Sequence, residues 1–207
     1  QNDFLSPGGT MYAHIKEQLA ERNVIANLQD LLANARGKVA KIFYCPFHPF
    51  DAGFPELKKG GPAYEGLRGI EIDMEADWGT GAWLRGTPGP EIIKELTPQP
   101  GDVVVEGKKT LDAFHSTALD YYLRANEIEY VVFTGFHTDW CVTESAAKQP
   151  PQFQTKCILS VPAHSEFFAT NNIQHVIGIV KCIVPYIAAR FVFRIKKRSG
   201  YQKKIIV

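Results

Sequence analysis

The chain has 207 residues, of which 45% are hydrophobic and 22% are charged, and its formal net charge is +1. This length and composition predict one globular domain with a buried core. The near-zero charge gives no reason to expect a nucleic-acid partner, and no run approaches the roughly 18 apolar residues of a membrane-spanning helix. We therefore expect the partner to be a small molecule or another protein.

The cysteines favour a reduced, cytoplasmic protein. They lie far apart, without the CxxC pairs of a zinc or redox site and without the density of a disulfide scaffold. There are four of them: Cys45, Cys141, Cys157 and Cys182. The chain opens with Gln1 instead of Met, which suggests that an upstream segment is missing.

The first third of the chain predicts a helix, a strand and a long irregular stretch. Residues 23–36 carry apolar side chains on one helical stripe, with Asn23 as a cap and Gly37 as a stop. Residues 39–45 are β-branched and aromatic, which is typical of a strand buried on both faces. Residues 46–100 are rich in Gly and Pro, and they either line a functional opening or form a surface excursion.

The rest of the chain alternates between strand and helix patterns. We expect strands at 102–106, 129–134, 156–161 and 189–195, and helices around 116–124, from Cys141 onward and around 172–184. This order predicts an α/β fold with a parallel sheet, whose ligands bind outside the carboxyl ends of the strands. The last 18 residues hold seven Lys or Arg and no acidic residue, and a solvated tail is the favoured interpretation.

Cys141 follows a predicted strand at the edge of the sheet where a catalytic residue is expected. In EYVVFTGFHTDWCV an apolar strand runs into Gly135, a turn follows, and a helix begins at Cys141. Unpaired amides and the helix dipole favour negative charge there, which predicts a nucleophilic thiolate. The same amides could hold an oxyanion. The other three cysteines lie in or next to strand and helix patterns and are interpreted as buried, inert thiols.

The segment 107–142, GKKTLDAFHSTALDYYLRANEIEYVVFTGFHTDWCV, resembles the isochorismatase-like cysteine hydrolases. In that family a lysine, a Phe-x-x-Thr-x-Leu helix start and a Gly-to-Cys-Val turn recur. Four further stretches are similar to the family in the same order: QNDFLSPGG at the start, FYCPFHP at 43–49, GTPG at 86–89 and PQPGDVVVEGK at 98–108. The resemblance covers residues 1 to about 147.

The resemblance implies a Rossmann-like, three-layer α/β domain over residues 1–195, followed by a basic tail at 196–207. Its sheet would have six mostly parallel strands with helices on both faces. The implied activity is hydrolysis of a small amide, or of a related C–N or ether-type bond, through a covalent thioester-type intermediate. The family triad is aspartate, lysine and cysteine. No organic cofactor is implied, and a homo-oligomer is expected.

The resemblance also assigns roles to individual residues. Cys141 matches the nucleophile, and Lys108 matches the lysine by its spacing from the helix start, whereas the neighbouring Lys109 fits less well. A cis peptide in the family maps to the bond between Phe136 and His137. The backbone amides of this turn, from Phe136 and His137 to Cys141, would then face the substrate oxygen, and the side chain of His137 stays unexplained.

Two departures concern the aspartate and the metal. Gln1 matches the glutamine of the family's Asp-x-Gln-x-Asp-Phe, so the catalytic aspartate and the central first strand would precede this chain, which we therefore interpret as truncated. Asp3 matches the second aspartate and is only a fallback base. Some members bind a metal through an Asp-x-His pair, but Pro46 stands in the position of that aspartate, so we expect no metal at His48.

A third departure is KQPPQF at 148–153, where adjacent prolines predict irregular structure instead of a continued helix. Two alternatives to the triad hydrolase remain. The chain could be a catalytically silent oligomer subunit or small-molecule binder, because the aspartate is absent. It could also be a Cys-His hydrolase, provided that one imidazole reaches the thiol, from His115, His137 or His164.

Overall fold

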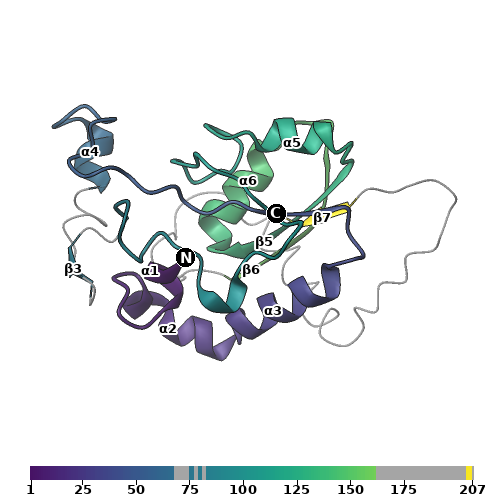
Figure 1. The fold of residues 1–207 in the computed structure, drawn as a ribbon, viewed down its shortest axis with the longest axis horizontal. Helices are drawn as coiled ribbons and strands as arrows, with labels where there is room; N and C mark the ends of the chain where they lie inside the picture. Colours follow the sequence, from purple (N-terminus) through teal and green to yellow (C-terminus); the bar gives the residue numbers. More distant parts are fainter. Residues whose placement is uncertain (68–74, 77–78, 81–82, 162–203, 207) are drawn as a thin grey trace, which may run out of the picture.

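A five-stranded parallel sheet forms the centre of the protein in the computed structural model, which describes residues 1–67, 75–76, 79–80, 83–161 and 204–206 (Figure 1). The strand order is β4-β1-β7-β5-β6, and each neighbouring pair runs parallel. The strands are β1 (Lys41–Tyr44), β4 (Val103–Val104), β5 (Tyr130–Phe136), β6 (Gln154–Val161) and β7 (Lys204–Ile206). The predicted α/β fold with a mostly parallel sheet is therefore confirmed.

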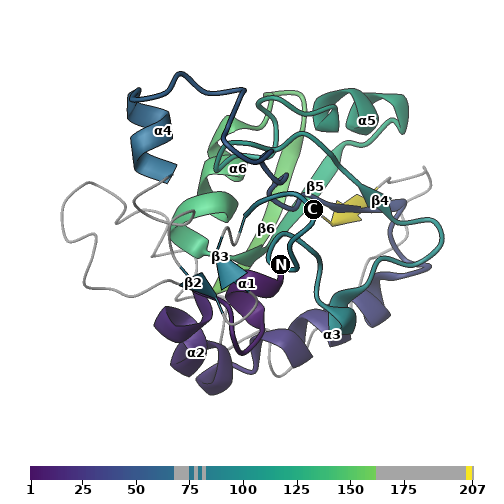
Figure 2. The same cartoon turned by 60° about the vertical axis from the view of Figure 1, so that its left-hand side comes forward.

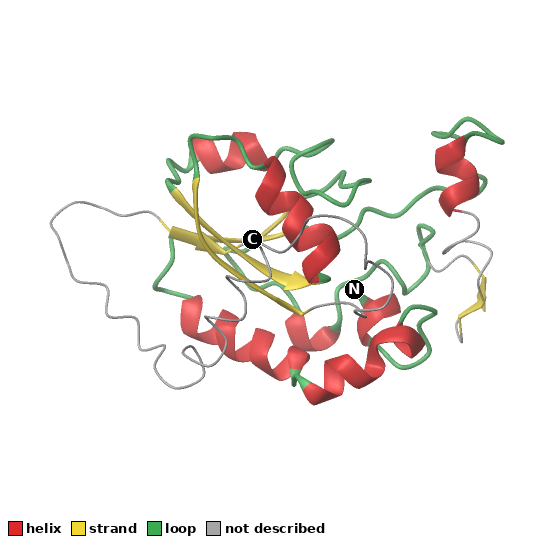
Figure 3. Cartoon of the chain, turned by 180° about the vertical axis from the view of Figure 1, so that it is seen from behind, coloured by secondary structure: helices red, strands yellow, loops and turns green. Residues whose placement is uncertain are grey.

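Helices cover both faces of this sheet, which gives three layers. Figures 1 and 3 show the first three helices along one face and α5 and α6 over the other. The first set is α1 (Asn2–Leu5), α2 (Tyr12–Glu21) and α3 (Val24–Ala35). The second set is α5 (Leu119–Ala125) and α6 (Thr143–Lys148).

The alternation of side chains along β1 and β5 builds the two cores. Ile42 packs into the cluster of α1–α3, while its neighbour Phe43 packs into the cluster of α5. In β5, Val131 and Phe133 point to the α5 side, and Val132 lies against the other cluster. Successive residues of a strand face opposite sides, so a strand covered on both faces is apolar throughout.

The predicted helix at 23–36 is confirmed as α3, one residue shorter at each end. Asn23 is the N-cap residue, as expected, and its carbonyl accepts from the amide of Asn27 at 2.9 Å. Its backbone is left-handed (φ 48°), and its side chain makes no capping hydrogen bond. Gly37 follows the helix with φ +76°, a conformation that glycine adopts readily.

The Gly- and Pro-rich stretch leaves the main sheet and returns to it. It contains α4 (Pro62–Leu67), the antiparallel pair β2 (Glu75–Ala76) and β3 (Gly79–Thr80), and the short helix η2 (Lys94–Leu96). Figures 1 and 2 place α4 at one end of the molecule, away from the sheet. Phe50 and Phe54 form a small separate core there.

The C-terminal region departs from expectation. Lys204–Ile206 form β7, which pairs with both β1 and β5. The prediction of a solvated tail is therefore wrong for these three residues. Residues 149–153 are irregular between α6 and β6, as the prolines predict. The helix expected at 172–184 and the strand expected at 189–195 lie outside the described residues. Within the described residues, none of the helices has the length and apolar character needed to cross a membrane.

Candidate active site

Cys141 lies just beyond the carboxyl end of β5. The strand ends at Phe136, and the peptide bond between Phe136 and His137 is cis. The carbonyl of His137 then accepts hydrogen bonds from the amides of Trp140 and Val142, both at 3.3 Å. These bonds close the turn η3 (Thr138–Val142), which leads into α6. The thiol therefore belongs to a tight turn directly before a helix, close to the predicted start of that helix.

Lys108 reaches Cys141 from the loop after β4. Its side chain is only 2% exposed, and its Nζ lies 3.5 Å from the Sγ of Cys141. The ammonium also lies 5.0 Å from the ring centroid of Phe47, a favourable cation–π distance. The backbone carbonyl of Lys108 accepts a hydrogen bond of 2.7 Å from the amide of His48. The lysine is thus held at both its backbone and its side chain.

Lys109 points elsewhere. Its Nζ donates to the carbonyl of Pro49 at 2.6 Å, pairs with Glu56 at 3.3 Å, and lies 3.8 Å from the ring centroid of Phe50. This side chain ties the loop after β1 to the loop after β4. Of the two adjacent lysines, only Lys108 contacts the cysteine that the sequence singles out.

Cys141 and Lys108 line a cavity of about 230 Å³. Gln1 also lines it, and the Gln1 side-chain amide donates to the carbonyl of Phe47 at 2.7 Å. Most of the remaining wall is apolar, from α1, α3, β1 and the loop after it, η2, and the end of β5 with its following turn: Phe4, Leu28, Leu32, Ile42, Phe47, Leu96, Phe136 and Trp140. Among the described residues that line the cavity, none is Asp or Glu.

Asp3 is buried but engaged inside its own loop. Its carboxylate accepts hydrogen bonds from the amide and the hydroxyl of Thr10 at 2.8 to 2.9 Å, and from the amide of Met11 at 3.3 Å. The carboxylate therefore fixes the turn between α1 and α2, and Asp3 is not among the residues that line the cavity. The geometry gives the fallback base a structural role.

Cys45 faces the same cavity with different properties. Burial raises the pKa of the Cys45 thiol to about 12, against the opposing charge of Lys108. A thiol with that pKa stays protonated at neutral pH and is a poor nucleophile. Cys157 lies in β6, and Cys182 lies outside the described residues.

The histidines considered as a base lie in different surroundings. His115 is largely exposed, and its Nδ1 lies 2.9 Å from a carboxylate oxygen of Asp112. His137 is buried on the cavity wall, with its ring centroid 5.2 Å from that of Phe4 and 5.1 Å from that of Trp140. His164 lies outside the described residues.

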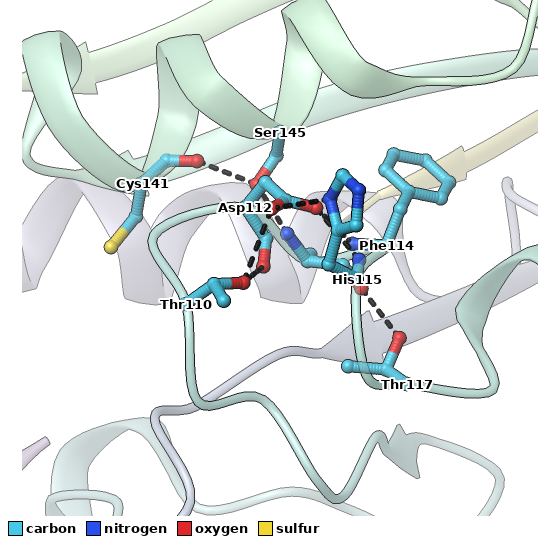
Figure 4. A network of polar contacts seen from close by, with 8 residues as sticks. Thr110, Asp112, Phe114, His115, Thr117, Cys141 and Ser145 are labelled. Atoms are coloured by element: carbon cyan, nitrogen blue, oxygen red, sulfur yellow. Dashed lines mark hydrogen bonds and ion pairs between the residues drawn. The ribbon is translucent and has the colours of Figure 1, made fainter. Parts of the chain in front are cut away.

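A polar network that the sequence reading missed surrounds Asp112 (Figure 4). Its carboxylate accepts hydrogen bonds from the amides of Phe114 and His115 and from the hydroxyl of Thr110. Burial opposes ionisation, but these bonds together hold the pKa of Asp112 below its usual value. An Asp side chain that accepts from backbone amides two and three residues further along forms an Asx-turn. The sequence signal for this turn is DAFH at 112–115.

No cluster of three or more His, Cys, Asp or Glu side chains that could hold a metal occurs in the described part of the chain. His48 follows β1, at the position where some family members are expected to bind a metal. Its backbone amide donates to the carbonyl of Lys108. The chemistry that the arrangement offers is that of a thiol next to an ammonium at the end of a parallel sheet, facing an apolar cavity.

Known proteins share the family and the fold of this chain. The family model described as the isochorismatase domain matches residues 1–148, which include Lys108 and Cys141. Among solved structures, an isochorismatase family protein from Desulfovibrio vulgaris subsp. vulgaris str. Hildenborough has 20% sequence identity and a TM-score of 0.58. The match covers 91% of this chain and 85% of that one.

Two further structures share the fold. N-carbamoylsarcosine amidase from Thermoplasma acidophilum has 24% identity and a TM-score of 0.54, with 80% of each chain covered. A cysteine hydrolase from Pseudomonas syringae pv. phaseolicola 1448A has 17% identity and a TM-score of 0.52, with 100% of this chain and 84% of that one covered. These likenesses show a common fold, and the family match over most of the chain shows more: the protein belongs to the isochorismatase family.

Proposed function

We propose that the protein is a cysteine hydrolase that cleaves a small amide, with Cys141 as nucleophile and Lys108 as its electrostatic partner. The observation that carries the proposal is the 3.5 Å contact between the Lys108 ammonium and the Cys141 sulfur inside a cavity of about 230 Å³. A neighbouring cation stabilises a thiolate, which is the nucleophilic form of cysteine. Membership of the isochorismatase family supports hydrolase chemistry in general.

The proposed reaction has two stages. The thiolate of Cys141 attacks the amide carbon, and the C–N electron pair leaves with a proton as the amine, so that an acyl thioester remains. Water then adds to the thioester carbon, the C–S bond breaks, and the acid is released while the thiol is regenerated. The balance is one amide and one water consumed for one acid and one amine.

The turn after β5 would stabilise the oxyanion of each stage. In this proposal, the donors are backbone amides of the segment from Phe136 and His137 to Cys141, where the cis bond lies. The amides of Trp140 and Val142 already donate to the carbonyl of His137. The amide of Cys141, beside the attacking sulfur, is therefore our main candidate for the oxyanion donor.

The cavity wall supports one substrate class over others. Lys108 is the only Lys or Arg among the described lining residues, and the rest of the wall is mainly aliphatic and aromatic. A charged acyl group would lose its hydration there without a matching partner, whereas an apolar one would gain from burial. We therefore favour uncharged amides with an apolar acyl group.

The proton acceptor is the open part of the triad. The family resemblance implies an aspartate in this role, and Gln1, which matches the glutamine of the same family pattern, lines the cavity. A second candidate function is a silent subunit or small-molecule binder. It is favoured by the absence of Asp and Glu from the described cavity wall.

The test uses the full-length protein and a panel of small amides, with product acids detected by mass spectrometry. We expect hydrolysis of at least one amide, loss of hydrolysis in Cys141→Ser, and an added acyl mass on Cys141 after rapid quenching. Cys45→Ser is the matched control, since that thiol faces the same cavity but is protonated at neutral pH.

The competing outcomes are distinct. Binding of a panel amide without turnover would favour the silent binder. Full hydrolysis by Cys141→Ala would contradict the cysteine mechanism. The same proposal includes a homo-oligomeric, cytoplasmic protein, which rests on the family resemblance and on the widely separated cysteines, and size-exclusion chromatography with light scattering tests the assembly.

A further inference from the structure

The side chain of Ser145 joins two segments that each carry a reactive group (Figure 4). Its hydroxyl donates to the backbone carbonyl of Cys141 at 2.5 Å and accepts from the backbone amide of Ala113 at 3.0 Å. Ser145 is only 5% exposed. One buried hydroxyl thus bonds to the nucleophile's own residue and to the loop that contains Lys108.

The first of these bonds is common and the second is not. A serine in a helix often donates to the carbonyl four residues earlier, so the bond to Cys141 alone would need no further explanation. The bond from Ala113, however, crosses 32 positions of the sequence. The Ser145 hydroxyl therefore donates to one segment, at Cys141, and accepts from the other, at Ala113.

The loop that Ser145 holds is itself stiff. Asp112, next to Ala113, accepts from the amides of Phe114 and His115 at 2.9 and 2.8 Å. Thr117 donates its hydroxyl to the carbonyl of Ala113 at 2.6 Å. A displacement at Ala113 would therefore be passed along the loop instead of being absorbed locally.

The loop that carries Lys108 is held at two points. The carbonyl of Lys108 accepts from the amide of His48, and five residues further along the amide of Ala113 donates to Ser145. The carbonyl of Cys141 accepts from the same Ser145 hydroxyl. One hydroxyl therefore links the residue of the sulfur to the loop that carries the ammonium.

We propose that Ser145 is a positioning residue for the Lys108–Cys141 pair, which rests on the function proposed above. By tying the Ala113 amide to the Cys141 carbonyl, it keeps the ammonium within contact of the sulfur. Without the hydroxyl, two buried backbone groups lose their partner, the two segments separate, and the ammonium stabilises the thiolate less.

The experiment compares Ser145→Thr with Ser145→Val in the full-length protein. These two side chains have nearly the same shape and differ in the hydroxyl. The readout is the rate of carbamidomethylation of Cys141 by iodoacetamide, followed by peptide mass spectrometry across a pH series. We expect Ser145→Thr to react much like the wild type and Ser145→Val to react about tenfold more slowly at neutral pH.

A merely structural role would not move the pH profile. We expect the alkylation profile of Ser145→Val to shift to higher pH, and kcat on a cleaved amide to fall more than KM changes. Thr10→Ala is the matched control, because it removes a buried hydroxyl bonded to Asp3 and does not line the cavity. It should leave the profile unchanged even where it lowers the free energy of unfolding.

The possible failures are separable. If Cys141 of the wild type resists iodoacetamide at neutral pH, the proposed function fails. If the wild type reacts and Ser145→Val has the same rate and pH profile, the positioning role of Ser145 is refuted while the proposed function stands. If Ser145→Val does not fold, Ser145→Ala is measured in its place and judged by the same criteria.

Discussion

The Nζ of Lys108 and the Sγ of Cys141 lie 3.5 Å apart although 33 positions separate the two residues. They meet because β4 and β5 run in the same direction through the sheet, so the loops after both strands emerge at one edge. Lys108 follows β4, and Cys141 follows β5. This is the edge at which parallel sheets of α/β proteins bind their ligands.

Replacing Lys108 by Met tests its charge with little change of shape. We expect kcat/KM to fall about 100-fold and alkylation of Cys141 to slow, because the thiolate loses its cation. The free energy of unfolding should fall little or even rise, since an apolar side chain replaces a buried charge. Activity assays, iodoacetamide kinetics and urea unfolding measure the three effects.

Lys109→Met is the control for that variant. It removes the same charge one position along the chain, where the side chain contacts Pro49 and Glu56 instead of the cysteine. Activity and alkylation should stay close to those of the wild type. Equal losses in the two variants would show that the net charge of the loop matters, and not the contact with Cys141.

Cys45 predicts a pH-dependent contribution to stability. Burial raises the pKa of its thiol from 9.0 to about 12, so the folded state holds this proton more tightly than the unfolded state does. The contribution is fully present below about pH 9 and is lost as the pH rises towards 12. Urea unfolding of the wild type and Cys45→Ala should show a difference in free energy that shrinks over this window.

The difference between the two proteins is the quantity to follow, because other lysines and tyrosines titrate in the same range in both. A difference that is constant from neutral to alkaline pH would contradict the buried, protonated thiol. At neutral pH the same property predicts that iodoacetamide leaves Cys45 unmodified in the folded protein.

The sequence predicted β1, β4, β5 and β6, and the resemblance predicted that Lys108 lies beside Cys141, because those features are local or carried by motifs. The apolar run at 39–45 and the stripe at 23–36 specify β1 and α3 through burial alone. The Lys108–Cys141 contact was accessible only through the resemblance, since an alternating α/β pattern does not say which loops meet.

Other features depend on contacts that no local pattern contains. The helix expected from residue 116 begins only at Leu119, because Ser116 has φ +63° and the hydrogen bonds of Asp112 and Thr117 hold the preceding residues in a loop. The pairing of Lys204–Ile206 with β1 and β5 joins residues more than 70 positions apart, and a basic run gives no signal for a central strand.

Asp112 predicts a second pH dependence, of opposite sign to that of Cys45. Because its folded pKa is lowered from 3.8, the carboxylate stabilises the fold above that pH and stops doing so as the pH falls through the folded value. Asp112→Asn should lower the free energy of unfolding by about 1 to 3 kcal/mol at neutral pH. The loss should shrink in acid.

Asp120→Asn provides the comparison for Asp112. Asp120 pairs with Arg124 one turn along the exposed face of α5, and such a pair contributes little. Urea unfolding of both variants near neutral pH and near pH 3 tests the prediction, with the pH chosen around the unfolded pKa. A loss for Asp112→Asn that is the same at both pH values would rule out the carboxylate as its source.

Gly107, directly before Lys108, is the position where backbone geometry matters most for the pair. Its φ is +88°, and a Cβ there would lie 2.6 Å from the carbonyl oxygen of Ser116. Gly101 offers a matched control, because it has φ +97° but a Cβ there meets no atom within 4 Å. Gly101→Ala should therefore cost only the backbone strain, about 1 kcal/mol.

Gly107→Ala should cost more, by about 1 to 3 kcal/mol, because the clash is with backbone and the loop must open. Opening moves Lys108 away from the sulfur, so alkylation of Cys141 should slow in Gly107→Ala and not in Gly101→Ala. Stability and alkylation are measured on the same two variants. If Gly107→Ala loses stability while Cys141 reacts at the wild-type rate, the geometry at Gly107 matters for folding and not for the position of the ammonium. The ammonium would then be held by Phe47 and the cavity wall.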